Sequence, residues 1–211
     1  MKIFKYGEVE IEYLTARDKK LRAAIDRIGM IEREVTPDRF TALVKSVVAQ
    51  QISTRAAQTV CGRLYDLLDE VTPACVAAIE PAMIQQCGMT MKKATYIKDI
   101  AEAALSGELD LHTLHTLSDA EIVKKLSSLN GIGVWTAEML LIFSLCRQDV
   151  VSWGDLGIRR GMMNLYGLKK LGKDQFEQHR KRYSPYGSTA SLYLWALSRL
   201  CRNETSSAIH K

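Results

Sequence analysis

The stretch that decides the fold is Leu129-Asn130-Gly131-Ile132-Gly133-Val134-Trp135-Thr136-Ala137. Its two glycines mark a tight turn between two apolar helical patterns. Upstream, Ser118-Asp119-Ala120-Glu121 predicts a capping box, in which serine and glutamate satisfy each other's backbone amides at the start of a helix. Apolar residues then recur at helical spacing on both sides of the turn. The sequence therefore predicts a helix, a short turn and a second helix over residues 118–145.

The glycines of this turn let the backbone approach another molecule closely. The first amide groups of the second helix lack partners within the helix, so they form a site for an anion. This arrangement favours phosphate binding by the backbone of Gly131 and Gly133. An ordinary helical hairpin with a glycine turn explains the same pattern, because short glycine motifs often match by chance.

A second stretch is Trp153-Gly154-Asp155-Leu156-Gly157-Ile158-Arg159-Arg160, which places one carboxylate at the start of a helix. Aspartate is a common N-cap, so a structural role alone accounts for Asp155. A catalytic role is compatible with it, because a capping carboxylate is fixed in place and kept ionised by the helix dipole. A phosphate site together with one isolated acid indicates chemistry on a nucleic acid rather than binding alone.

The composition is that of a soluble globular protein, with 211 residues, 47% of them hydrophobic and 25% charged. The net charge of +5 is compatible with a polyanionic partner without requiring one. No apolar run is long enough for a membrane span, and the N-terminus lacks the features of a signal peptide. We therefore expect no membrane partner and a cytoplasmic, nucleoid-associated location, or a nuclear one in a eukaryote.

The five cysteines are odd in number and widely spaced, and no C-x-x-C pair occurs. This spacing argues against a disulfide framework or a zinc site, so we expect reduced thiols. The residues are Cys61, Cys75, Cys87, Cys146 and Cys201.

The helical periodicity predicts an all-α chain with two helical lobes and a central cleft. Residues 36–145 would form a middle lobe that contains the hairpin at 118–145, and residues 1–35 would pair with 146–211 as the terminal lobe. Near the N-terminus, Val9, Ile11 and Tyr13 alternate with charged residues, which predicts a short β-like segment. We expect a monomer.

These motifs together resemble the helix-hairpin-helix (HhH-GPD) superfamily of DNA glycosylases, whose signature is a hairpin followed by an aspartate. The segment from Asp155 to Gly161 is similar to the 3-methyladenine DNA glycosylase II branch. The resemblance covers roughly residues 15–202. Three further segments fit that branch: Ala49-Gln50-Gln51-Ile52-Ser53, Gly88-Met89-Thr90-Met91-Lys92-Lys93-Ala94-Thr95-Tyr96-Ile97 and Tyr193-Leu194-Trp195.

The resemblance implies that Asp155 is the catalytic carboxylate of a base-excision repair enzyme. Cleavage of an N-glycosidic bond builds positive charge on the sugar, and a preorganised anion stabilises that charge and orients or deprotonates the attacking water. Many relatives carry two consecutive acids here. This chain has Gly154 before Asp155, so any support from the first acid is lost.

Trp135 stands where relatives that also cut the DNA backbone carry a lysine that forms a Schiff base. Without that amine no imine intermediate forms. The resemblance therefore implies a monofunctional glycosylase in which water attacks and an abasic site is the product. A core role for Trp135 is the alternative, and it leaves this conclusion unchanged.

The resemblance assigns the base pocket to four side chains. Electron-rich aromatic faces attract a cationic alkylated purine and stack on flat bases. Each aromatic residue is also a candidate for the hydrophobic core. The four are Trp135, Met139, Trp153 and Trp195.

The base must be flipped out of the duplex before it can be reached. Gln51 aligns with the position that fills the resulting gap, although a solvated turn residue is the alternative. We predict DNA contacts at Gln50, Gln51, Ser53, Gly131, Gly133 and Thr136. The basic residues Lys92, Lys93, Arg159 and Arg160 are either phosphate contacts or solvated surface charges.

Relatives often bind a monovalent cation through backbone carbonyls of the hairpin turn, which correspond here to Ser127, Leu129 and Ile132. Some relatives also carry a four-cysteine iron–sulfur loop after the last helix. Only Cys201 lies near that position, so we expect neither an iron–sulfur cluster nor any required cofactor.

The predicted function is hydrolysis of the N-glycosidic bond of alkylated purines, of the 3-methyladenine and 7-methylguanine type, in damaged double-stranded DNA. The alternative is a non-catalytic helix-hairpin-helix protein that binds DNA or senses damage, which would not need Asp155 beside aromatic residues. A mismatch-type thymine or adenine glycosylase is the nearest rival among enzymes. The sequence leaves the preferred lesion and the preference for single or double strands open.

Overall fold

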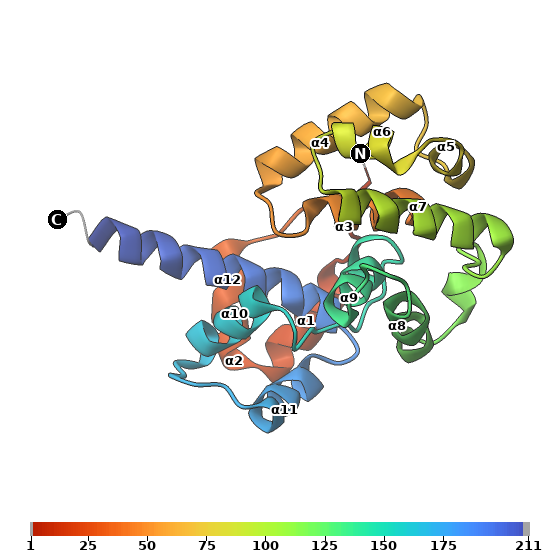
Figure 1. Ribbon diagram of the computed structural model, residues 1–211. Coiled ribbons are helices and arrows are strands. Elements are labelled where there is room, and N and C mark those ends of the chain that lie inside the picture. The colour runs from red at the N-terminus through yellow and green to blue at the C-terminus, as the bar shows by residue number, and fades with distance from the viewer. Residues whose placement is uncertain (1, 209–211) are drawn as a thin grey trace. The chain divides into compact units, whose positions relative to one another are not determined.

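The computed structural model describes the backbone of residues 2–208 and the side chains of residues 2–200, which excludes the side chain of Cys201. In this range the chain is helical apart from turns and an isolated antiparallel bridge between Ile3 and Glu34 (Figure 1). The predicted all-α class is confirmed. No helix in this range is long and apolar enough to span a bilayer.

The chain divides into two compact units, Met1–Val35 with Cys146–Lys211 and Thr36–Leu145, here called the terminal unit and the middle unit. The terminal unit contains α1 (Glu8–Arg17), α2 (Lys19–Ile28), α10 (Leu156–Tyr166), α11 (Lys173–Tyr183) and α12 (Gly187–Ala208). The middle unit contains α3 (Arg39–Ala49), α4 (Thr54–Leu68), α5 (Pro73–Ala78), α6 (Pro81–Gln86), α7 (Met91–Ser106), the 3-10 helix η1 (Thr113–Thr116), α8 (Asp119–Ser127) and α9 (Val134–Phe143).

Residues 8–17 form helix α1, so the prediction of a β-like segment at Val9, Ile11 and Tyr13 is wrong. The carboxylate of Glu10 accepts a hydrogen bond from the amide of Gly7 at 2.8 Å and so caps the helix. Leu14 is buried in the core of the terminal unit, whereas Val9 is 66% exposed. A capped end and the burial of one face outweigh a short alternation of apolar residues.

The closest helix pair of the terminal unit is α10 and α12. A Cβ at Gly161 of α10 would lie 1.9 Å from the carbonyl oxygen of Leu194 on α12, so only glycine allows this approach. Phe176, Tyr183 and Tyr193 are fully buried around this contact. The packing therefore determines how the start of α10 lies against α12.

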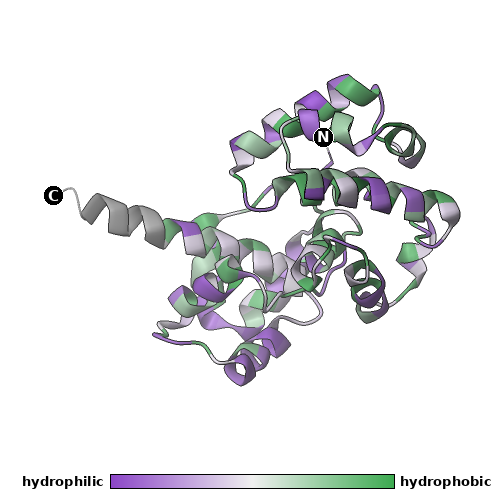
Figure 2. Ribbon diagram, in the orientation of Figure 1, coloured by the Kyte–Doolittle hydropathy of each residue, from purple (hydrophilic) through white to green (hydrophobic). Residues whose placement is uncertain are grey.

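The middle unit is organised around α7, which packs against α3, α5 and α6. Thr90 caps this helix by accepting a hydrogen bond from the amide of Lys93, and Ile97 and Ile100 are fully buried. Hydropathy colouring shows that α9 is hydrophobic along most of its length, whereas α11 of the terminal unit is largely hydrophilic (Figure 2).

The predicted hairpin is confirmed as α8, a turn over residues 128–133 and α9. The capping box also forms, since Ser118 N–H donates to the Glu121 carboxylate at 2.8 Å and Glu121 N–H donates to Ser118 Oγ at 3.3 Å. Within the turn, Ile132 N–H donates to the carbonyl of Leu129 at 3.1 Å. Gly131 adopts a φ of +83°, a conformation that glycine takes up without steric cost.

Candidate active site and DNA interface

Asp155 is the N-cap of α10, as its position in the sequence predicted. Its Oδ1 accepts a hydrogen bond from the amide of Ile158 at 2.8 Å, and the residue is only 7% exposed. The positive end of the α10 dipole lies at this carboxylate. The start of the helix thus holds a nearly buried anion in one orientation.

A second donor reaches the same oxygen from α12. The indole Nε1 of Trp195 donates to Asp155 Oδ1 at 3.0 Å. Gly157 makes room for this pair, because a Cβ there would lie 2.8 Å from Trp195 Cδ1 and 3.0 Å from Asp155 Oδ1. The sequence singled out Trp195 only as a base contact. Its hydrogen bond to Asp155 depends on the packing of α10 on α12.

This arrangement suits the stabilisation of a developing positive charge. Two N–H donors hold one carboxylate oxygen in place before any substrate arrives, so little reorganisation is needed when charge develops. A fixed anion of this kind fits the electrostatic requirement of an oxocarbenium-like transition state.

Trp153 packs against the core of the terminal unit. Its ring meets that of Phe176 edge-on at a centroid distance of 5.1 Å. The guanidinium of Arg159 lies 5.0 Å from the centre of the Trp153 ring, where a cation–π contact is favourable. These contacts give both residues structural roles that the sequence did not show.

The start of α9 presents the amide groups predicted to bind phosphate. Its N-cap is Gly133, and no side chain caps the first turn of the helix. Gly133 is exposed and Val134 is 55% exposed, so this end of the helix is open to solvent. An uncapped and accessible helix N-terminus fits an anion.

Trp135 and Met139 lie one helical turn apart on α9, where residues at this spacing share a face. Trp135 is 44% exposed. Thr136 is only 4% exposed. Contact between its hydroxyl and DNA stays a prediction.

Residues 50–53, here called the plug turn, connect α3 and α4. Gln51 is exposed and has a φ of +58°, a backbone conformation that is unfavourable for a residue with a side chain. Such strain is retained where surrounding contacts impose it, and it often marks a functional position. Ser53 caps α4 by accepting from the amide of Ala56 at 3.2 Å.

Two residues predicted near DNA are instead engaged within the middle unit. Gln50 donates its side-chain amide to the carbonyl of Gly131 at 2.7 Å. Lys93 donates its ammonium to the carbonyls of Val48 and Gln50 at 2.8 and 2.5 Å. Both side chains thus have partners inside the middle unit, and DNA contact by Gln50 stays a prediction.

The predicted cation ligands are backbone atoms of the hairpin. Ser127 is the last residue of α8, and the turn that follows contains Leu129 and Ile132. Carbonyl oxygens at a helix C-terminus carry partial negative charge and lack partners within the helix. In the described residues, no group of three or more His, Cys, Asp or Glu side chains is arranged for a metal ion. The carbonyl of Leu129 already accepts a hydrogen bond from the amide of Ile132 at 3.1 Å, and cation binding by these atoms stays a prediction.

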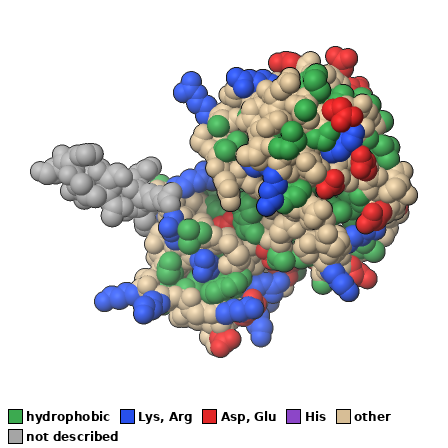
Figure 3. Space-filling view, in the orientation of Figure 1, with side chains coloured by type: hydrophobic (Ala, Val, Ile, Leu, Met, Phe, Trp, Pro, Cys, Tyr) green, Lys and Arg blue, Asp and Glu red, His purple; other side chains and the backbone are tan. Residues whose placement is uncertain are grey.

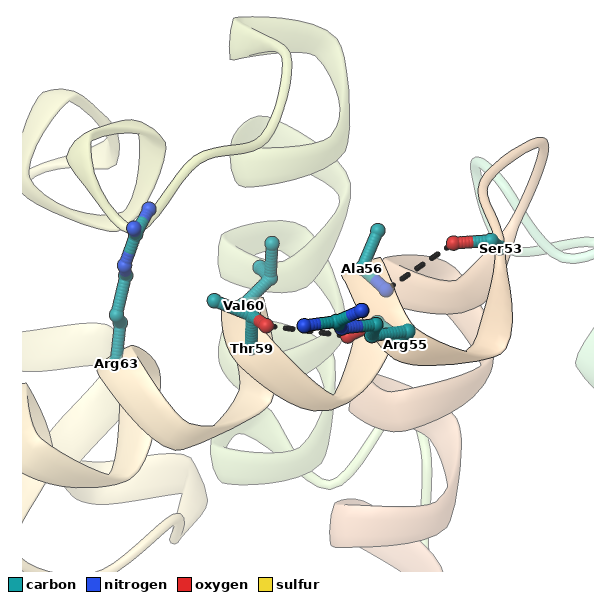
Figure 4. Close-up of a pocket in the computed structure, with 6 residues that line it drawn as sticks. All are labelled: Ser53, Arg55, Ala56, Thr59, Val60 and Arg63. Atoms are coloured by element: carbon teal, nitrogen blue, oxygen red, sulfur yellow. Dashed lines mark hydrogen bonds between the residues drawn. The ribbon is translucent and has the colours of Figure 1, made fainter.

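A hollow of about 410 Å³ lies along α4, next to the plug turn (Figure 4). The residues that line it are Ser53, Arg55, Ala56, Thr59, Val60 and Arg63. No motif in the sequence marks Arg55 and Arg63, although their spacing places them on one helix face. Lys and Arg side chains are spread over both units in the view of Figure 3, so charge alone does not mark a DNA surface on this face.

The comparison with protein families agrees with this site. Residues 44–185 match the HhH-GPD superfamily of base excision DNA repair proteins, a range that includes the plug turn, the hairpin and Asp155. The chain belongs to this superfamily. It is therefore a DNA glycosylase of base excision repair, and DNA is its binding partner.

The most similar relatives cover nearly the whole chain. DNA-3-methyladenine glycosylase 1 of Schizosaccharomyces pombe is 33% identical over 196 residues, which span 89% of this chain and 86% of that protein. Among solved structures, a DNA-3-methyladenine glycosidase from Bacillus halodurans has a TM-score of 0.84 and 35% identity, covering 94% of this chain and 93% of that one. The 3-methyladenine DNA glycosylase Mag1 of S. pombe, solved in complex with abasic DNA, has a TM-score of 0.79 and 28% identity, covering 89% and 95%.

Proposed function

We propose that this glycosylase hydrolyses the N-glycosidic bond of alkylated purines, of the 3-methyladenine and 7-methylguanine type, and leaves an abasic site. The observation that carries the proposal is Asp155, a nearly buried carboxylate held by the α10 amide of Ile158 and the indole of Trp195. The names of the relatives support the choice of substrate class.

In the proposed mechanism, Asp155 stabilises the positive charge that develops on the sugar as the base leaves. Water then adds to the sugar, and Asp155 orients it or accepts its proton. A purine with an extra alkyl group on the ring is cationic, so it leaves as a neutral base without a strong general acid. This chemistry needs one acidic residue, which agrees with the glycine at position 154.

Base recognition is proposed for the aromatic side chains predicted from the sequence. Trp135 and Met139 share a face of α9, and the exposed ring of Trp135 suits stacking on a cationic base. Trp195 combines an aromatic face with its hydrogen bond to Asp155. Trp153 is the weakest of the four candidates, because Phe176 and Arg159 already occupy parts of its ring surface.

The lack of lyase activity is also proposed. Relatives that cut the backbone use a lysine at the position of Trp135, and an indole does not form an imine. In the middle unit, the ammonium of Lys93 is engaged by two backbone carbonyls and is not offered to a sugar. Water is then the nucleophile of the whole reaction.

DNA engagement is proposed to combine the open N-terminus of α9 with the plug turn. The amides beginning at Gly133 would bind phosphates, while Gln51 would fill the gap left by the flipped base. A monovalent cation held by the carbonyls of Ser127, Leu129 and Ile132 would strengthen the phosphate contact by adding positive charge. We expect one monomer per lesion, which sedimentation of the complex with duplex DNA measures. Replacement of K⁺ by a bulky organic cation tests whether a cation at these carbonyls contributes to DNA binding.

The deciding experiment is incubation of methylated duplex DNA with the protein and identification of the released bases by chromatography. Release of 3-methyladenine or 7-methylguanine supports the proposal. A protein that binds the duplex and releases no base would instead be a damage-binding member of the superfamily. Release of thymine or adenine from mismatches alone would contradict the substrate class.

A further inference from the structure

One face of α7 contacts both DNA-binding elements of the middle unit. Lys93, Tyr96 and Asp99 follow one another at intervals of three residues, which places them along one side of the helix. This set is here called the α7 contact face. Each of its members reaches either the plug turn or the hairpin turn.

Lys93 contacts the plug turn. Its ammonium donates to the carbonyl of Val48, in the last turn of α3, and to the carbonyl of Gln50, the residue before Gln51. Burial lowers the pKa of Lys93. The backbone on the N-terminal side of Gln51 is thereby held by two charge-assisted hydrogen bonds.

Tyr96 and Asp99 contact the hairpin turn. A Cβ at Gly131 would lie 2.2 Å from Tyr96 Cδ2, so the glycine backbone lies directly against the ring. Asn130 donates its side-chain amide to the carboxylate of Asp99 at 3.4 Å. Two neighbouring residues of the hairpin turn thus lie against the helix that carries Lys93.

Gln50 connects the two turns directly. Its side-chain amide donates to the carbonyl of Gly131 at 2.7 Å, although the two residues are 81 positions apart in the sequence. The plug turn, the hairpin turn and α7 therefore form one closed set of contacts. A displacement of one turn strains the hydrogen bonds of the other.

We infer that Lys93 is a positioning residue, which holds Gln51 at the distance from the phosphate-binding hairpin that insertion into DNA requires. The inference rests on the proposed function of Gln51 as the plug. The left-handed backbone of Gln51 is unfavourable in isolation, and the hydrogen bonds to Val48 and Gln50 oppose its relaxation. Small errors of position cost much in such a site, because a displacement of about 1 Å lowers catalytic rates severely.

The chain offers a matched control on the same helix. Lys98 of α7 donates its ammonium to the carbonyls of Ala77 and Ile79, the latter at 2.9 Å, and so bridges two carbonyls as Lys93 does. These carbonyls belong to α5 and the residue after it, and not to either DNA-binding turn. Lys98→Met therefore removes the same kind of contact without loosening the plug turn.

The test measures how strongly the full-length protein prefers a duplex with a tetrahydrofuran abasic site over the same duplex undamaged. Lys93→Met should lower this preference about tenfold, while Lys98→Met should leave it within about twofold of the wild type. Lys93→Arg, which keeps two N–H donors, should restore most of it. Thermal unfolding of both methionine variants checks that they lose similar stability.

A double-mutant cycle separates positioning from general structure. If Lys93 acts through the plug, Lys93→Met added to Gln51→Ala should change the preference by less than about twofold, because the positioned side chain is already gone. If the losses of preference in the two single variants multiply in the double variant, the inference is overturned. A Lys93→Met variant with the wild-type preference for abasic DNA would also overturn it. Should Lys93→Met fail to fold, Gln50→Met breaks the adjoining link and must give the same result.

The preference for abasic DNA is measured without excision. Failure of the proposed function and failure of the positioning role of Lys93 can therefore be distinguished. A wild-type protein that prefers abasic DNA but releases no methylated purine would contradict the proposed substrate and leave the inference standing. A wild-type protein without any preference for abasic DNA would overturn the positioning role itself.

Discussion

The indole nitrogen of Trp195 donates a hydrogen bond to Oδ1 of Asp155 at 3.0 Å, across 40 residues of sequence. The same oxygen caps α10 through the amide of Ile158. One carboxylate oxygen therefore joins the start of α10 to the side of α12, and the proposed catalytic group is oriented by both helices.

Asp155→Asn should lower single-turnover excision of 3-methyladenine by at least ~100-fold, because the anion acts on charge that develops in the transition state. Affinity for the damaged duplex should remain near that of the wild type. Asp38→Asn provides a matched control, since Asp38 is the exposed N-cap of α3 and accepts from the amide of Thr41 at 2.7 Å. Near-normal excision by Asp155→Asn would remove Asp155 from the mechanism.

Trp195→Phe keeps an aromatic ring and removes the donor to Asp155. A hydrogen bond to a charged group contributes roughly 1.5–3 kcal/mol, so excision should fall by about tenfold or more if the bond orients the carboxylate. Gly157→Ala should act in the same direction, because its Cβ would press on both partners. Gly62→Ala, at a helical glycine with no atom within 4 Å of the added carbon, should leave excision unchanged and raise stability by ~0.5–1 kcal/mol. Equal excision by all three variants would assign the hydrogen bond a packing role only.

The two glycines of the hairpin turn should respond differently to substitution. Gly133 has a φ of −87° and no atom within 4 Å of an added Cβ, so Gly133→Val should fold and weaken binding to damaged and undamaged duplexes alike. Gly131→Ala should instead destabilise the fold by ~1–3 kcal/mol, because the new carbon meets the Tyr96 ring. Fluorescence anisotropy over a series of salt concentrations and thermal unfolding check both variants. Wild-type affinity and salt dependence in Gly133→Val would make the turn purely structural.

Abasic DNA produced by the enzyme should stay intact until alkali is added. In the proposed mechanism Trp135 stands where relatives with lyase activity carry an imine-forming lysine, so borohydride should trap no covalent adduct. Denaturing gels of the reaction with and without borohydride make the measurement. A trapped protein–DNA adduct would identify an attacking amine and refute the monofunctional mechanism.

The stability of the terminal unit should decrease as the pH falls below about 6.5. His179 is buried, with its ring stacked on Tyr166 at 3.8 Å. Burial lowers its pKa below 6.5, nearby Arg182 lowers it further, and Asp18 partly offsets the shift. At pH values between the folded-state and the unfolded-state pKa of His179, its imidazole is protonated in the unfolded chain and neutral in the folded one. Stability therefore rises with pH in this window and is lost as the pH falls through it.

His179→Gln removes this proton and should flatten the dependence of the melting temperature on pH between about 7.5 and 5.5. Only the slope is compared, since the substitution also changes the stacking on Tyr166. An unchanged slope in the variant would mean that other groups cause the loss of stability in acid.

Local interactions made parts of this molecule predictable from the sequence. The capping box of Ser118 and Glu121 and the N-cap role of Asp155 depend on residues three positions apart, so they appear wherever those residues occur in order. The absence of a Cβ permits the positive φ of Gly131 but does not determine it, since Gly133 has a φ of −87°. The all-α class and the hairpin could be predicted because both depend on such local preferences and on the helical spacing of apolar residues.

Tertiary structure decided what depends on residues far apart in the chain. Alternation at Val9, Ile11 and Tyr13 predicted a strand, yet burial of Leu14 and a capped end made it a helix. Lys93 and Gln50 are polar residues of a kind that usually lies at the surface. Only the fold places carbonyl oxygens within hydrogen-bond distance of their side chains. No spacing rule links Trp195 to Asp155, because their hydrogen bond exists only where Gly161 lets α10 approach α12. The sequence alone identified Asp155 and Trp195 as candidate site residues, and packing determined that their side chains meet.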